Sequence, residues 1–189
     1  MPNAQRIVIR IKKGTDGRNA LSCLRADGTT TWQRQEGARA AFFPRHDLTH
    51  YAVETTLGHR EGFYGLVSAG WDFSDFGHPW PRGRLPIEAS ISEMIVGVLD
   101  MERRMGERAS AEELNKKLAE YATDNSLPQH RELTEEDLDR VRAKRAEMFA
   151  RWDAVRPGDA LEIPFEVAQA NLRDEAAPSL HRKNAARHP

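Results

Sequence analysis

Apolar and polar residues alternate near the start of the chain. Residues 6–12 read RIVIRIK, and their three isoleucines share one face with a period of two, which predicts a β-strand. Residues 20–35 hold two more strand-like runs on either side of Asp27-Gly28, a dipeptide that favours a type I′ hairpin turn. The first 35 residues are therefore predicted to form a three-stranded antiparallel meander.

The same alternation returns near the other end of the sequence. After a turn at Pro157-Gly158, the apolar residues again fall on one face with a period of two: Leu161, Ile163, Phe165 and Val167. Pro164 has no backbone N–H to donate to a neighbouring strand, so this strand is predicted to lie at a sheet edge.

Helical periods fill the middle of the chain. One helix is predicted from about Pro44 to Gly58, and a second, amphipathic one ends near Gly106. Ser110 with Glu113, and Thr134 with Asp137, have the capping-box spacing that begins two further helices. Residues 62–86 are rich in glycine, proline and aromatics without a sustained period, which predicts a long loop that acts either as a lid or as a plug for the core.

These elements together predict the fold class. Strands at both ends with helices between them indicate a single α+β domain over residues 1–167. In this fold an N-terminal antiparallel meander precedes the central helices, and the C-terminal strand returns to the sheet edge. Residues 168–189 are charged and rich in alanine, with no apolar period, and are predicted to form a flexible tail.

Composition narrows the possible functions. Hydrophobic residues make up 39% of the chain and charged residues 30%, a balance that suits a folded protein. The formal net charge is −1, and basic residues in the helix at 135–155 are interleaved with acidic ones, which indicates a solvated helix face. We therefore expect neither a nucleic acid nor a membrane as partner.

Cysteine content and hydropathy add two further expectations. Cys23 is the single cysteine, so an internal disulfide and a thiolate-rich zinc site are both excluded. The sequence shows neither a signal-peptide pattern nor an apolar run of about 18 residues, and we expect a soluble cytoplasmic protein.

The densest candidate chemistry lies in FFPRHDLTHYAVETTLGHREGF, residues 42–63. His46 and His50 are one helical turn apart, in the same sector as two apolar residues that should face inward, and Glu54 lies at its margin. Two imidazoles at this spacing can reach one metal, and Glu54 can supply a third ligand, leaving a position for water. Asp47 would orient an imidazole or act as the catalytic base. Zinc, manganese and iron all suit these ligands.

The HDLTH sequence at residues 46–50 resembles the HDxxH core of the zinc motif in the coenzyme Q biosynthesis protein family. The resemblance implies that His46, Asp47 and His50 belong to a metal site. It covers five residues, the glutamate that follows falls one position short at Glu61, and the predicted N-terminal strands differ from that family's largely helical fold.

Two functions remain open from the sequence. The first is a small metal-dependent enzyme, for example a hydrolase, that acts on a small molecule in a pocket walled by Trp71 and Phe73. The second is a non-enzymatic module that docks a partner protein, with hydrogen-bonded structural histidines and no metal. One divalent metal and no metal are equally compatible with the sequence.

Overall fold

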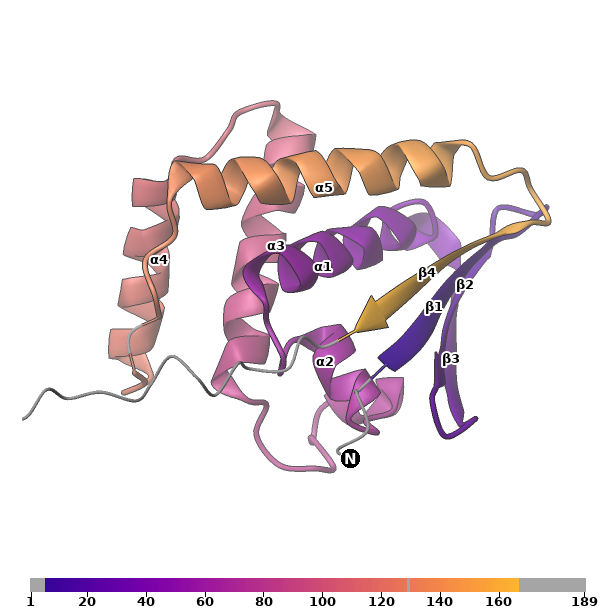
Figure 1. Cartoon of the computed structure of the whole chain (residues 1–189), viewed down its shortest axis with the longest axis horizontal. Helices are drawn as coiled ribbons and strands as arrows, with labels where there is room; N and C mark the ends of the chain where they lie inside the picture. The colour runs from indigo at the N-terminus through magenta and orange to yellow at the C-terminus, as the bar shows by residue number, and fades with distance from the viewer. Residues whose placement is uncertain (1–5, 129, 167–189) are drawn as a thin grey trace, which may run out of the picture.

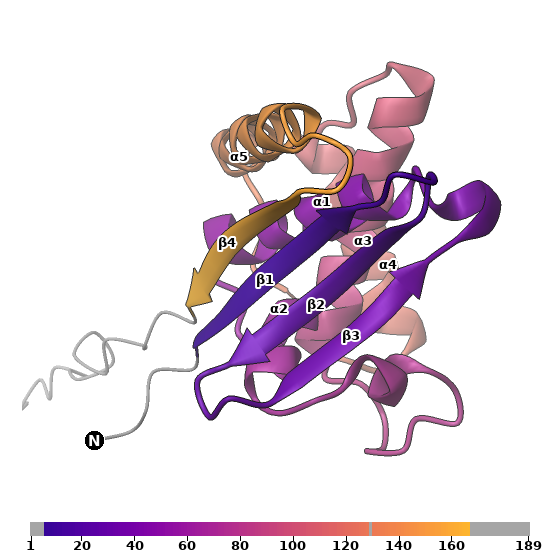
Figure 2. The ribbon, with the colours of Figure 1, turned by 90° about the vertical axis from the view of Figure 1, so that its right-hand side faces the viewer.

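A four-stranded antiparallel sheet forms one layer of the protein, in the strand order β3-β2-β1-β4. The computed structural model describes residues 6–128 and 130–166. Figures 1 and 2 show the helices on one face of the sheet and the other face uncovered. This arrangement confirms the predicted α+β class, including the meander and the returning C-terminal strand. The strands are β1 (Arg6–Lys13), β2 (Asn19–Arg25), β3 (Thr30–Gln35) and β4 (Ala160–Glu166).

The alternating pattern places the core on one side of the sheet. Ile9 of β1 is fully buried and pairs with Cys23 of β2 and Ile163 of β4. Pro164 lies on β4, which is an edge strand, as its missing N–H predicted. Val167 and the predicted tail at 168–189 lie outside the described residues.

The turn between β2 and β3 differs from the type I′ prediction. Only Gly28 has a positive φ, of 86°, whereas a type I′ turn also needs one at Asp27. The N–H of Arg25 donates to the carbonyl of Thr29 at 2.9 Å, and the N–H of Gly28 donates to that of Arg25 at 3.0 Å. These bonds close a three-residue loop that ends in a left-handed glycine.

The helices begin and end where the sequence signals predicted. Helix α1 has Pro44 in its first turn and ends at Gly58, which has φ 75°. The capping boxes of Ser110 with Glu113 and of Thr134 with Asp137 are both formed. The main helices are α1 (Phe43–Leu57), α3 (Ile87–Met105), α4 (Ala111–Asp124) and α5 (Glu135–Asp153), and a short 3-10 helix, η1 (Gly37–Arg39), precedes α1.

Residues 62–86 are not one long loop, because they include helix α2 (Phe63–Ser68) and the 3-10 helix η2 (Phe73–Phe76). Sequence patterns missed α2 because no local side chain caps it. Its first N–H groups bind the carboxylate of Glu54 on α1. Phe63, Phe73 and Phe76 pack against the core between sheet and helices, so this part of the segment is a plug.

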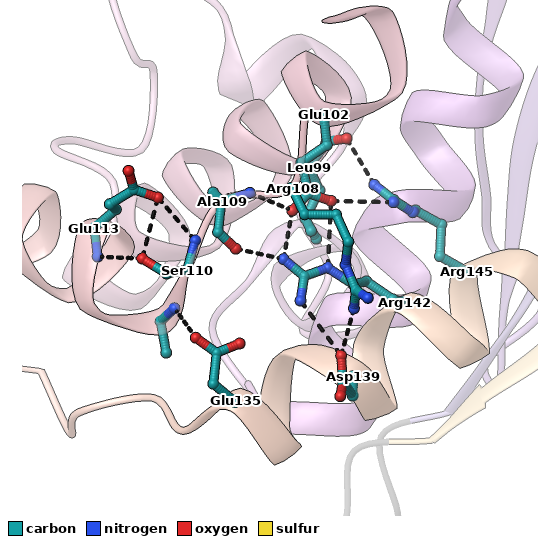
Figure 3. Close-up of polar contacts among 11 residues, drawn as sticks. Leu99, Glu102, Arg108, Ala109, Ser110, Glu113, Glu135, Asp139, Arg142 and Arg145 are labelled. Atoms are coloured by element: carbon teal, nitrogen blue, oxygen red, sulfur yellow. Dashed lines mark hydrogen bonds and ion pairs between the residues drawn. The ribbon is translucent and has the colours of Figure 1, made fainter. Parts of the chain in front are cut away.

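A buried ion-pair network joins α3, α4 and α5 (Figure 3). Glu102 at the end of α3 pairs with Arg142 and Arg145 of α5 and accepts a hydrogen bond from the N–H of Ala109, just before α4. The side chains of Arg142 and Arg145 are only 11% and 13% exposed. The expectation that the basic residues of α5 form a solvated face is therefore wrong for these two arginines.

The length and hydropathy of the helices show whether any of them could span a membrane. Within residues 6–128 and 130–166, none of the helices has the length and apolar character needed to cross a membrane.

Candidate metal centre

Several polar residues of helix α1 point into the protein. The sequence predicted this, because His46 and His50 share one side of the helix with the apolar residues Val53 and Leu57. His50 and Asp47 are each 4% exposed, and Glu54 is 1% exposed. His46, one turn before His50, is half-buried, and the two imidazole rings lie edge to face with centroids 4.8 Å apart. Burying this many ionisable groups is costly unless each finds a partner, so their contacts define the site.

His46 is oriented by a carboxylate from α3. Its Nδ1 lies 2.8 Å from Oδ2 of Asp100, which is 5% exposed. The His46 ring also stacks on Phe42, with centroids 5.2 Å apart. Because Asp100 occupies Nδ1, the nitrogen left to bind a metal is Nε2.

His50 lies between two glutamates. Its Nδ1 is 3.4 Å from Oε1 of Glu54, and its Nε2 is 3.1 Å from Oε2 of Glu93 on α3. Burial disfavours the charged imidazole, but the two carboxylates outweigh burial and raise the pKa of His50 to about 10. The two carboxylates thus favour the imidazolium form of His50 in the absence of metal, and a metal that binds Nε2 would have to displace a proton from that nitrogen.

Glu54 lies on the Nδ1 side of the His50 ring, opposite the Nε2 atom that faces Glu93. Its Oε2 accepts hydrogen bonds from the N–H groups of Tyr64 at 2.9 Å and Gly65 at 3.2 Å. Burial raises the pKa of Glu54, an effect that the neighbouring His50 opposes. Within the described residues, neither Oε1 of Glu54 nor Nδ1 of His50 has a hydrogen-bond partner, so their 3.4 Å approach is not a hydrogen bond. A small shift that shortens this contact would satisfy both atoms.

Three side chains converge as a possible ligand set: His46, His50 and Glu93, with one ligand atom from each within 4.8 Å of the others. Atoms about 2.1 Å from a tetrahedral zinc are roughly 3.4 Å apart, so the set must contract. Glu93 is the member that can move, because its side chain is 63% exposed. Two imidazoles and a carboxylate match catalytic zinc sites and the facial triad of iron enzymes. The carboxylate in this candidate set is Glu93, whereas the sequence predicted Glu54.

A cavity of about 670 Å³ opens beside this ligand set. Asp47 lines it, and the side-chain amide of Gln35 donates to Oδ2 of Asp47. Burial raises the pKa of Asp47 to about 6, although Gln35 and the two histidines act in the other direction. A carboxyl group that titrates near neutral pH can accept or donate a proton there.

The aromatic walls of the cavity are not the predicted ones. Phe63 and Phe76 line it, whereas Trp71 and Phe73 do not. Phe73 stacks on Phe63 with centroids 5.5 Å apart, and Trp71 packs against Phe76 at 5.5 Å. Trp71 and Phe73 therefore do not face the cavity but pack against the two phenylalanines that do.

Two acidic residues of α3 that contact the histidines, Glu93 and Asp100, were not among the predicted site residues. Glu93 and Asp100 are two helical turns apart in an amphipathic helix, and such spacing puts both on one face. Glu93 contacts His50 and Asp100 contacts His46, so each of these two carboxylates of α3 meets one histidine of α1. The available signal was the spacing of these two carboxylates, which places them on the same face of the predicted helix.

Comparison with models of protein families, with curated proteins and with solved structures found no match to this chain.

Proposed function

We propose that His46, His50 and Glu93 bind one divalent metal ion and that the chain is a metal-dependent enzyme acting on a small molecule. One observation carries this proposal. Each histidine has its Nδ1 near a buried carboxylate, 2.8 Å from Asp100 for His46 and 3.4 Å from Glu54 for His50, and the remaining ligand atoms converge with Glu93 at the wall of a cavity. Carboxylates behind metal-bound histidines fix the ring orientation and raise the basicity of the ligand nitrogen.

Hydrolysis is the reaction class that these groups support best. A divalent metal lowers the pKa of a bound water and polarises a carbonyl group. With a metal bound, Asp47 would take the proton that the water loses as the water oxygen bonds to the carbonyl carbon. Asp47 would then give that proton to the leaving oxygen or nitrogen as the bond to it breaks. A pKa of about 6 leaves Asp47 mostly ionised and ready to accept a proton at neutral pH.

Metal content tests the proposal directly. Inductively coupled plasma mass spectrometry of the purified, untagged protein should find near-stoichiometric zinc, manganese or iron, and the His46→Ala/His50→Ala double variant should hold none. His78→Ala is the matched control, because His78 is exposed and lies outside the ligand set. Circular dichroism must show that the double variant is folded. A folded wild type that stays free of metal after incubation with all three ions contradicts the proposal.

A second candidate function, docking of a partner protein, rests on the uncovered face of the sheet. Trp32 on the edge strand β3 is 62% exposed, and Leu24 on β2 is 47% exposed. Large exposed apolar side chains are common at interaction surfaces. Absence of metal, together with self-association that Trp32→Ser abolishes in analytical ultracentrifugation, would favour this function over the enzyme.

A further inference from the structure

We infer that the cavity beside the proposed metal centre accepts an uncharged small molecule with an apolar body about the size of a benzene ring. This inference rests on the proposed function and specifies the substrate class of the same site. Its basis is the division of the cavity into one polar end and several apolar walls.

The walls come from five separate elements. Phe43 begins α1, Phe63 and Phe76 belong to α2 and η2, and Met94 and Tyr121 lie on α3 and α4. Phe63 also touches the polar end, because its ring centroid is 5.4 Å from that of His50. An apolar group bound here would therefore contact aromatic rings directly beside the ligand set.

The charges around the cavity indicate that its ligand is uncharged. None of the described residues around the cavity is a lysine or an arginine, whereas Asp47 and Glu93 are both acidic. Sites for phosphate or carboxylate groups commonly use arginine or lysine side chains to balance the charge. With a divalent ion bound to Glu93, the metal end balances its own charge, and an anionic group at the apolar end would be buried without a counter-charge.

The cavity volume agrees with a small substrate. About 670 Å³ lies in the middle of the range for sites that hold molecules of drug size, roughly 300–1,000 Å³. A ring and a short polar group therefore fit with room for water.

Three hydroxamic acids test this inference on the full chain. Acetohydroxamate carries only the metal-binding group, benzohydroxamate adds a ring, and 4-carboxybenzohydroxamate adds an anion at the far end of that ring. Isothermal titration calorimetry of the zinc-loaded protein should show benzohydroxamate binding about 10-fold or more tighter than acetohydroxamate. The 4-carboxy probe should lose most of that gain.

A Met94→Lys variant supplies the missing positive charge, with Met94→Leu as its apolar control. In Met94→Lys the 4-carboxy probe should bind tighter than it does to the wild type, and in Met94→Leu it should not. The inference is overturned if the 4-carboxy probe binds Met94→Lys no tighter than it binds the wild type. It is also overturned if the wild type binds acetohydroxamate and benzohydroxamate equally well. The proposed function still stands in either case, provided that the protein binds metal.

A protein that does not bind metal would give a different result in these titrations. If the folded wild type binds none of zinc, manganese and iron, the proposed function fails, and the same three probes are titrated into the metal-free protein. A retained preference for benzohydroxamate over both other probes then supports an apolar, uncharged-ligand cavity without a metal. Loss of that preference overturns both proposals.

Discussion

At the scale of single residues, the site depends on the partners of its histidines as much as on the histidines themselves. Glu54 and Asp100 contact the Nδ1 atoms of His50 and His46 from behind. The local spacing of His46 and His50 could be found in the sequence because one helical turn separates them. Asp100 could not be assigned to His46, since 54 residues separate the two and only tertiary packing joins them.

Neutralising these supporting carboxylates should weaken metal binding without removing a ligand. We expect Glu54→Gln and Asp100→Asn each to lower zinc affinity by about 10–100-fold, because the histidine rings lose orientation and basicity. Competition with a chromophoric chelator measures the affinity. Glu61→Gln is the control, since Glu61 is exposed and outside the ligand set. Unchanged affinity in both variants would show that the two carboxylates have no role in a metal site.

His59 gives a prediction of pH-dependent stability away from the proposed ligands. Its Nδ1 lies 2.6 Å from Oγ of Ser92, and burial lowers its pKa to about 4, with Glu88 raising it and His130 and Arg131 lowering it further. The unfolded chain, with a histidine pKa near 6.5, binds this proton more readily than the folded chain does. Stability is therefore fully present above pH 6.5 and is lost as the pH falls towards 4.

Urea unfolding at pH 7.5 and pH 5 checks this expectation in the wild type and in His59→Gln. The variant removes the titrating group, so it should lose less stability on acidification than the wild type, by a difference on the order of 2 kcal/mol. Other groups that titrate in this range cancel in the comparison. Equal losses in the two proteins would mean that His59 is not held neutral by the fold.

At the scale of elements, the sequence specified the regular strands and helices because each has its own local signal. The apolar alternation of β1 and the capping boxes of α4 and α5 are examples. Helix α2 lacks such a signal, since its N-terminal N–H groups are satisfied by Glu54 from another helix. The β2–β3 turn was assigned the wrong type because Asp27-Gly28 is compatible with more than one loop length.

The entry to α2 requires a glycine at position 62. A Cβ placed there would lie 2.5 Å from Cδ of Glu54, whose carboxylate is already held by α2. Gly62→Ala should therefore destabilise the protein by about 1–3 kcal/mol in urea unfolding, since a buried side chain must shift. Gly77→Ala is the control, because its nearest neighbour would be 3.5 Å away, an ordinary contact. Similar midpoints for both variants would contradict this packing.

The network in Figure 3 predicts different costs for a buried and an exposed carboxylate. Glu102→Ala leaves Arg142 and Arg145 without their buried partner, and should lower the free energy of unfolding by about 3 kcal/mol. Asp139→Ala removes a carboxylate that is 62% exposed and pairs with Arg108 and, at 3.4 Å, with Arg142. Because this carboxylate is exposed to solvent, its loss should change stability little. Thermal and urea unfolding of the two variants measure the difference. Equal effects would show that Glu102 does not hold the three helices together.

At the scale of the whole molecule, the candidate site exists only because α1 and α3 pack together beside the sheet. His46 and His50 come from one helix, and Glu93 and Asp100 come from the other. The sequence could therefore indicate the histidine pair and its inward direction. It could not indicate which distant carboxylate completes the ligand set, because a nearer one, Glu54, has suitable spacing along the same helix.

Anomalous diffraction from crystals of the zinc-loaded protein, recorded at the zinc absorption edge, tests this central claim most directly. The expected result is one peak bound by Nε2 of His46, Nε2 of His50 and a carboxylate oxygen of Glu93, at about 2.0–2.2 Å. Glu54 and Asp100 should then contact the two Nδ1 atoms. A peak bound by other residues, or no peak while His50 still bridges Glu54 and Glu93, would contradict the metal centre.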